Sequence, residues 1–113
     1  MTLTDAEKTR RLAEGVMGWN LRGYAWCDST GYPQRRTTDW QPLHNEAHAA
    51  EVRERMRELG WHYEICSNSP GYVYVEFFTL SPRREYFVSG QTVPTTICHA
   101  ALLALELAKE EEL

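Results

Sequence analysis

Three short segments near the middle of the chain constrain its fold most strongly, because apolar and polar residues alternate along each of them. They cover residues 61–66, 72–79 and 85–88, and the connectors, 67–71 and 80–84, contain turn-forming residues such as Ser and Pro. Alternation with a period of two is typical of half-buried β-strands, and Ser and Pro favour tight turns. The sequence therefore predicts a three-stranded antiparallel meander.

If the two residues that flank each five-residue connector pair with each other, every strand residue is assigned to one of two sheet faces. This closure pairs Cys66 with Tyr72 and Thr79 with Glu85. One face, predicted to be core, then collects Trp61, Tyr63, Ile65, Val73, Val75, Phe77 and Phe87. The other face is aromatic but carries charge, and it collects His62, Glu64, Cys66, Tyr72, Tyr74, Glu76, Phe78, Tyr86 and Val88.

Three helices are predicted around this meander, ending near residues 17, 59 and 109. Thr4 and Glu7 have capping-box spacing at the start of the first helix, and Asn45 can cap the second, which Gly60 ends. Pro94 suits the first turn of the third. The second helix carries a regular apolar stripe of Ala49, Val52, Met56 and Leu59. The third has the broadest apolar arc, which predicts the most buried of the three helices.

Residues 19–43 are less regular, and they predict one short strand near 22–27 followed by an aromatic loop that lies over the domain, with room for a second short strand in it. The order of elements predicts a single α+β domain over residues 1–113. We expect an α-β-α sandwich in which an antiparallel sheet of three to five strands carries three helices on its faces.

The composition limits the function classes more than it identifies one. The chain has 113 residues and a net charge of −4, which argues against nucleic-acid binding over its whole surface. Three cysteines, Cys27, Cys66 and Cys98, leave an odd count, and we find neither a signal peptide nor an apolar run of membrane-spanning length. These features predict reduced thiols and a cytoplasmic protein.

Three longer sequence blocks point to a family. The first helix ends in VMGW (Val16–Trp19), the second reads AAEVRERMRELGW (Ala49–Trp61), and the end of the chain contains REYFVSGQTVPTTICHAALLALE (Arg84–Glu106). Together they resemble the phage ABA-sandwich domain family of small bacteriophage and prophage proteins. The resemblance implies helices on both sides of a sheet. It implies no activity, so no functional residue carries over from the family.

The candidates for catalysis and metal binding are weak on spacing. His44 and His48 lie four residues apart, but Glu46 does not directly follow the first histidine, as a zinc protease requires. His62, Glu64 and Cys66 share one strand face without a second pair of ligands. Adjacent Cys98 and His99 point about 100° apart on a helix. We therefore predict no enzyme activity, no cofactor and no metal site.

Two arginine pairs beside aromatic residues are the best candidates for a partner-binding surface, because arginine and aromatic side chains dominate protein hot spots and single-stranded nucleic-acid sites alike. This surface comprises Arg35, Arg36, Trp40, Arg83, Arg84 and Tyr86. Glu76, between Tyr74 and Phe78 on one strand face, is a candidate pocket carboxylate for a cationic or hydrogen-bonding ligand.

The sequence favours a non-catalytic phage accessory protein that binds a host or phage protein, or a small ligand such as a nucleotide. Opposing a host defence is one role compatible with this interpretation. The alternative is a small module that binds single-stranded nucleic acid through its arginine loops, and an enzyme or metal protein ranks third. No membrane partner is expected, and an exposed sheet edge or the last helix could mediate a homodimer.

Overall fold

The computed structural model describes all residues of the chain, 1–113, as three α-helices, six strands and one short 3₁₀ helix. In chain order these are α1 (Asp5–Gly15), β1 (Asn20–Arg22), β2 (Ala25–Cys27), β3 (Pro33–Arg36), α2 (Glu46–Glu58), β4 (His62–Ser69), β5 (Tyr72–Leu80), β6 (Arg83–Gly90), α3 (Val93–Ala104) and η1 (Glu110–Glu112).

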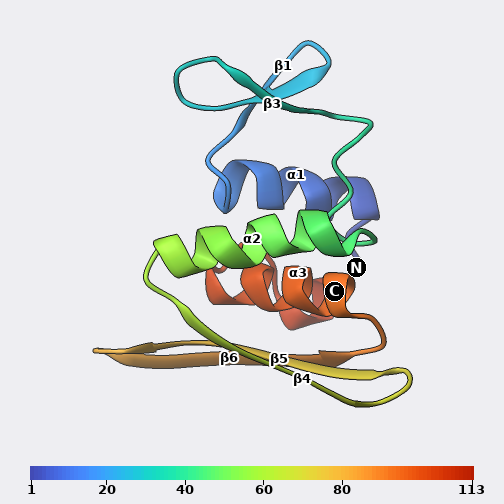
Figure 1. The fold of residues 1–113 in the computed structure, drawn as a ribbon, viewed down its shortest axis with the longest axis vertical. Helices are drawn as coiled ribbons and strands as arrows, with labels where there is room; N and C mark the ends of the chain where they lie inside the picture. Colours follow the sequence, from blue (N-terminus) through green and yellow to red (C-terminus); the bar gives the residue numbers. More distant parts are fainter.

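The predicted α+β class, the three helices and the C-terminal meander are confirmed, and the strands form two separate antiparallel sheets, β1-β2-β3 and β4-β5-β6. In Figure 1 the meander lies at one end of the longest axis, the helices are stacked above it, and the small sheet lies at the other end, beyond α1. The layer order thus differs from the expected one: all three helices lie on the same side of the β4–β6 sheet. Residues 19–43 contain the three strands of the small sheet, more than the one or two short strands predicted there.

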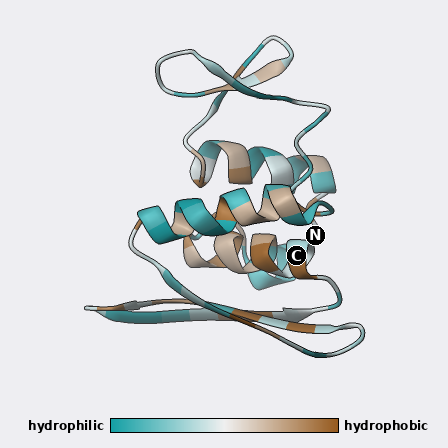
Figure 2. Ribbon diagram, viewed as in Figure 1, coloured by the Kyte–Doolittle hydropathy of each residue, from teal (hydrophilic) through white to brown (hydrophobic).

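α3 is the central element of the core, because it contacts α1, α2, β5 and β6. Eight of its residues are buried, as its broad apolar arc predicts. Figure 2 shows that α3 is among the most hydrophobic elements, whereas the small sheet is mostly hydrophilic. α2 adds Ala49, Val52 and Met56 to the core, but Leu59, the last residue of its predicted stripe, is 43% exposed. The helix has already ended there, ahead of Gly60 with its φ of 98°.

The predicted helix starts are confirmed at α1 and α2. The Thr4 hydroxyl accepts from the Glu7 backbone N–H at 3.2 Å, and the Glu7 carboxylate accepts from the Thr4 N–H at 3.3 Å, which completes a capping box. The backbone N–H of Thr4 and the Thr4 hydroxyl, which donates to the Glu7 carboxylate at 3.0 Å, lower the pKa of Glu7. The Asn45 side chain accepts from the His48 N–H at 3.0 Å and caps α2.

α3 ends at Ala104, earlier than the predicted end near residue 109. Glu106 adopts a left-handed φ of 56°, and the Leu107 N–H donates back to the Leu102 carbonyl at 2.8 Å. This is the bond that closes a Schellman motif, with a glutamate in the position where glycine is usual. The pattern of apolar residues continues past this stop and does not reveal it. The length predicted for α3 from the sequence was therefore too great.

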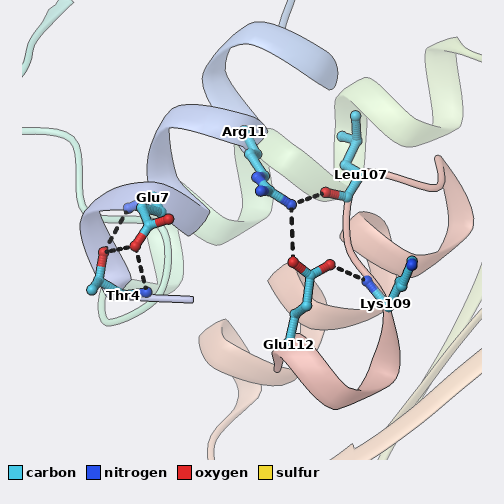
Figure 3. A network of polar contacts seen from close by, with 6 residues as sticks. All are labelled: Thr4, Glu7, Arg11, Leu107, Lys109 and Glu112. Atoms are coloured by element: carbon cyan, nitrogen blue, oxygen red, sulfur yellow. Dashed lines mark hydrogen bonds and ion pairs between the residues drawn. The ribbon is translucent and has the colours of Figure 1, made fainter. Parts of the chain in front are cut away.

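The segment after α3 folds back onto α1 (Figure 3). Arg11 of α1 donates to the Leu107 carbonyl at 2.7 Å and lies 3.8 Å from the Glu112 carboxylate. The same carboxylate accepts from the Lys109 N–H at 2.9 Å. The Leu3 N–H adds a backbone bond of 2.8 Å to the Glu112 carbonyl. The acidic end of the chain is therefore held against α1.

The register of the meander corrects the predicted faces of its last strand. Leu80 pairs with Arg83 and Thr79 with Arg84, so the β5–β6 turn is two residues long and the pairing is shifted by one from the predicted Thr79–Glu85 pair. A shift by one moves every side chain of β6 to the opposite face. Phe87, predicted in the core, is 61% exposed, whereas Tyr86 and Val88 pack against the core.

The β4–β5 hairpin departs from its predicted register by two residues instead of one. Cys66 pairs with Tyr74 and not with Tyr72, and an irregularity between Cys66 and Ser69 absorbs the difference. A shift by an even number leaves the faces unchanged. Val73, Val75 and Phe77 are accordingly buried, as the alternation predicts.

Candidate functional site

The face of the β4–β6 sheet that points away from the helices is not covered by any element of the chain (Figure 1). Two aromatic contacts join neighbouring strands on this outer face: His62 stacks on Phe78 at 5.3 Å, and Tyr74 lies 5.9 Å from Phe87. The outer face comprises His62, Glu64, Cys66, Tyr72, Tyr74, Glu76, Phe78, Leu80, Arg83, Glu85, Phe87 and Ser89. An aromatic sheet face open to solvent is unusual for a monomer and is typical of interaction surfaces.

Glu64 and Glu76 face each other directly across β4 and β5 on this outer face. Like charges at directly opposed positions destabilise an antiparallel pair, so the fold keeps an unfavourable contact here. The Tyr74 hydroxyl donates to Glu76 at 3.3 Å. Burial raises the pKa of Tyr74, and the carboxylates of Glu76, Glu64 and Glu85 raise it further. Three carboxylates therefore act on one hydroxyl group, and the outer face has a negative centre between its two aromatic contacts.

Glu76 was predicted to be a pocket carboxylate, but in the structure it lies on an open sheet face. It is half-buried, in the middle strand of an open sheet, and it lines none of the four main clefts of the molecule. The sequence placed it correctly between Tyr74 and Phe78 on one strand face. It placed Tyr86 on that face too, and the register shift of β6 brings Phe87 and Glu85 there instead.

The two arginine pairs do not form one surface. Arg35 and Arg36 lie on β3 and Arg83 and Arg84 on β6, at opposite ends of the molecule in Figure 1. Three of the four are paired with carboxylates: Arg35 contacts Glu51, Arg83 lies 2.7 Å from Glu85, and Arg84 lies 3.8 Å from Glu106. Arg36 is exposed and forms no ion pair.

The aromatic members predicted beside these arginines serve the packing of the domain. Trp40 is only 1% exposed and packs edge-on against Trp19 at 4.8 Å, so it is not part of an exposed surface for a protein partner. Tyr86 is half-buried and packs edge-on against Trp61 at 5.9 Å. The Arg84 guanidinium lies 5.7 Å from the Trp61 ring and 5.8 Å from the Tyr86 ring, which completes a stack at this end of the sheet.

The histidines near α2 are engaged in local contacts. His44 lies 2.7 Å from the Asp5 carboxylate, and the His48 Nδ1 atom accepts from the Gln41 N–H at 3.0 Å. No set of three His, Cys, Asp or Glu side chains is arranged to hold a metal ion. Cys98 is fully buried, and this burial raises the pKa of its thiol, which disfavours the reactive thiolate.

None of the helices has the length and hydrophobicity needed to cross a bilayer. A search of curated proteins finds no match. The crystal structure of a phage protein from Bacillus cereus ATCC 14579 has the same fold: the TM-score is 0.72 at 17% sequence identity, over 100% of this chain and 94% of that one. The model of the phage ABA sandwich domain matches residues 10–102. The chain belongs to this family.

The sequence blocks that carry the likeness to phage ABA sandwich domains supply the core of this one. Val16 and Trp19 of the VMGW block are buried, and Gly18 between them, just beyond the end of α1, has a φ of 73°. In the block at the start of α3, residues 97, 98 and 100–102 are all buried. The sequence blocks that mark the family therefore consist largely of core residues. For this reason they do not identify a functional site.

His99 is the polar exception in that block. Its Nε2 atom accepts a hydrogen bond of 3.0 Å from the Lys8 ammonium of α1, and Lys8 is only 6% exposed. A lysine can only donate, so this imidazole must be neutral, with its proton on Nδ1. Burial lowers the pKa of His99 to about 4, the Lys8 charge lowers it too, and Asp5 acts in the opposite direction.

This pair predicts an acid-sensitive contact between α1 and α3. Between pH 6.5, the ordinary histidine value, and about pH 4, the unfolded chain binds a proton that the folded chain does not. The free energy of unfolding should therefore fall as the pH decreases through this window, and His99 should contribute no pH dependence above it. Urea titrations of the wild type and His99→Gln, which keeps an acceptor for Lys8, measure the difference. Equal slopes against pH in the two proteins would contradict the assignment.

Proposed function

We propose that this phage ABA sandwich domain is a non-catalytic binding protein that holds a basic segment of a host protein on the outer face of its β4–β6 sheet. The main observation in support is the Glu64–Glu76 pair, whose like charges repel each other in the free protein. The pair lies between two solvent-facing aromatic contacts. An arginine or lysine side chain placed between the carboxylates would relieve their repulsion. The flanking rings would add cation–π contacts.

The charge of this face favours a basic protein partner over the other candidates. The outer face carries Glu64, Glu76 and Glu85 against a single arginine, Arg83, which already pairs with Glu85. A phosphate backbone would be repelled here. A second copy of the same face would repeat the carboxylates and be repelled as well. Interference with a host defence protein is one role that such binding would serve.

Neutralising the carboxylate pair should separate stability from binding. In Glu64→Gln we expect the folded state to gain up to about 1 kcal/mol, because one partner of the like-charge pair is removed. The same substitution should reduce recovery of the host partner. The measurements are thermal unfolding at low salt and quantitative co-purification from host cells, with Glu76→Gln as the second variant.

Glu58→Gln is the matched control, since Glu58 is an exposed residue at the end of α2 and remote from the outer face. It should lower the stability by no more than about 0.5 kcal/mol, since it removes only the exposed ion pair with Arg55, and it should leave the recovered partner unchanged. Full recovery of the same partner by Glu64→Gln and Glu76→Gln would contradict the proposal, even if both variants were stabilised.

The nucleic-acid alternative loses support from the pairing of the arginines. Because Arg35, Arg83 and Arg84 each contact a carboxylate, few positive charges are free to neutralise phosphates. We expect no sub-micromolar binding of a single-stranded oligonucleotide at physiological salt, measured by fluorescence anisotropy. Tight binding that falls steeply with salt and disappears when all four arginines become alanine would contradict this expectation.

A further inference from the structure

A cleft of about 500 Å³ opens between α1 and the small sheet, at the opposite end of the molecule from the outer face. Its volume is within the range of sites for small molecules. Three kinds of segment contribute to its walls: the first turns of α1, the β1–β3 sheet, and the connection from β3 to α2. This cleft is independent of the surface proposed for the protein partner.

The cleft combines an aromatic floor with a polar rim. Trp26 and Trp40, 5% and 1% exposed, belong to its lining together with the buried Leu43. Around them lie the hydroxyl group of Thr9, the guanidinium of Arg10 and the amide of Gln41. The two formal charges among the lining residues, the Asp5 carboxylate and the Arg10 guanidinium, are opposite in sign and offset each other. An apolar floor with a few polar groups and no excess charge suits an uncharged, flat ligand.

Both tryptophans of this floor carry an unmet hydrogen-bond donor. The indole Nε1 atoms of Trp26 and Trp40 are buried, and neither has an acceptor within the protein. A buried donor without a partner costs on the order of 1–3 kcal/mol. Tyr and Trp donors usually find a partner when they are buried, so two orphaned donors in one cleft wall are a marked exception.

We propose that the cleft binds an uncharged planar heteroaromatic compound of nucleoside size, whose ring packs on the tryptophan floor and whose acceptor atoms take up the indole N–H groups. Stacking needs the flat ring, and the unmet donors need acceptors at its edge. Both indole Nε1 atoms are buried, so the proposed binding requires a wall side chain to move. Leu21, a lining residue that is 53% exposed, is the side chain to which we assign this movement.

The indole N–H groups themselves report on this binding. The chain has four tryptophans, so a proton–nitrogen correlation spectrum shows four indole signals, assigned by single Trp→Phe variants. Titration with adenosine, guanosine, cytidine and uridine, each to millimolar concentration, should move the signals of Trp26 and Trp40 for at least one nucleoside. The signal of Trp61, which lies against the β4–β6 sheet, should stay in place.

Two variants locate the site. Ala6→Phe adds a ring to an exposed lining residue of α1 and should weaken nucleoside binding at least ten-fold while the fold remains intact. Trp26→Phe keeps the apolar floor but removes one donor, and the affinity should fall roughly three- to ten-fold. The proposal is overturned if no nucleoside moves the Trp26 and Trp40 signals, or if Ala6→Phe binds as tightly as the wild type. The nucleoside titration does not depend on the proposed protein partner, so failure to find such a partner would not change its outcome.

Discussion

Replacing Phe77 by aspartate is expected to leave the domain unfolded at physiological temperature. Phe77 is fully buried in the middle strand of the meander and lies in the same core as α3. Removing a buried phenylalanine costs about 3–5 kcal/mol, and placing an unpaired carboxylate in the core adds to this loss. A domain of this size has only about 5–15 kcal/mol of stability in total. Circular dichroism and the yield of soluble protein measure the outcome.

Phe87→Asp is the matched control, because Phe87 is the same residue type on the adjacent strand. It is 61% exposed on the outer face, so the variant should fold and lose only about 1 kcal/mol, including the repulsion from Glu76 in the same row. The predicted register placed Phe77 and Phe87 together in the core. Unfolding of both variants would therefore support that register and contradict the observed one.

Replacing Trp40 by alanine should produce the second-largest loss. Trp40 is 1% exposed and in edge-on contact with Trp19, although it lies in the connection between β3 and α2. Truncating such a side chain costs about 3–5 kcal/mol and leaves a cavity. Denaturant unfolding followed by circular dichroism measures the loss.

Tyr24→Ala provides the comparison for Trp40→Ala, since Tyr24 is an aromatic residue of the same region and 89% exposed. It should change the stability by no more than about 0.5 kcal/mol. If Trp40→Ala were as stable as Tyr24→Ala, Trp40 would belong to the surface, as the sequence alone suggested, and the packing described here would be wrong.

The helix starts and the core stripes could be predicted because their signals are local. A cap such as Thr4 or Asn45 satisfies backbone N–H groups within one turn, and the stripe of α2 follows from the helical period alone. The end of α3 depends on the left-handed Glu106, a residue type that gives no such signal. The segment that follows contacts Arg11, a long-range contact that the sequence does not reveal.

The length of the β5–β6 turn determines which residues of β6 lie on the outer face of the meander. The connector between β5 and β6 was predicted to have five residues, but the turn has only two, residues 81–82. This difference moves the side chains of β6 to the opposite face of the sheet, so Phe87 and not Tyr86 lies on the outer face. Sequence alternation alone could not distinguish these registers, because both faces of β6 carry an aromatic residue. Glu76 was found from sequence because β5 lies in the middle and its alternation is complete. Glu64 appeared only as a metal candidate, since its role depends on the strand opposite.

The buried tryptophans were harder to place. Residues 19–43 lack a regular period, so Trp26 and Trp40 could be recognised as too apolar for a free linker but not assigned to a floor or a surface. Their positions follow from long-range contacts, such as the packing of Trp40 on Trp19 at the end of α1. The same holds for Lys8 and His99, which meet although they are far apart in the chain.

Site-specific cross-linking in host cells tests the central claim most directly. A photoreactive phenylalanine analogue at Phe87 samples the outer face, and the same analogue at Tyr24 samples the small sheet at the other end of the molecule; both positions are exposed. We expect irradiation to yield an adduct with one host protein from position 87 and none from position 24. No adduct from position 87, an adduct from position 24 alone, or an adduct of two copies of this chain would contradict the proposed surface.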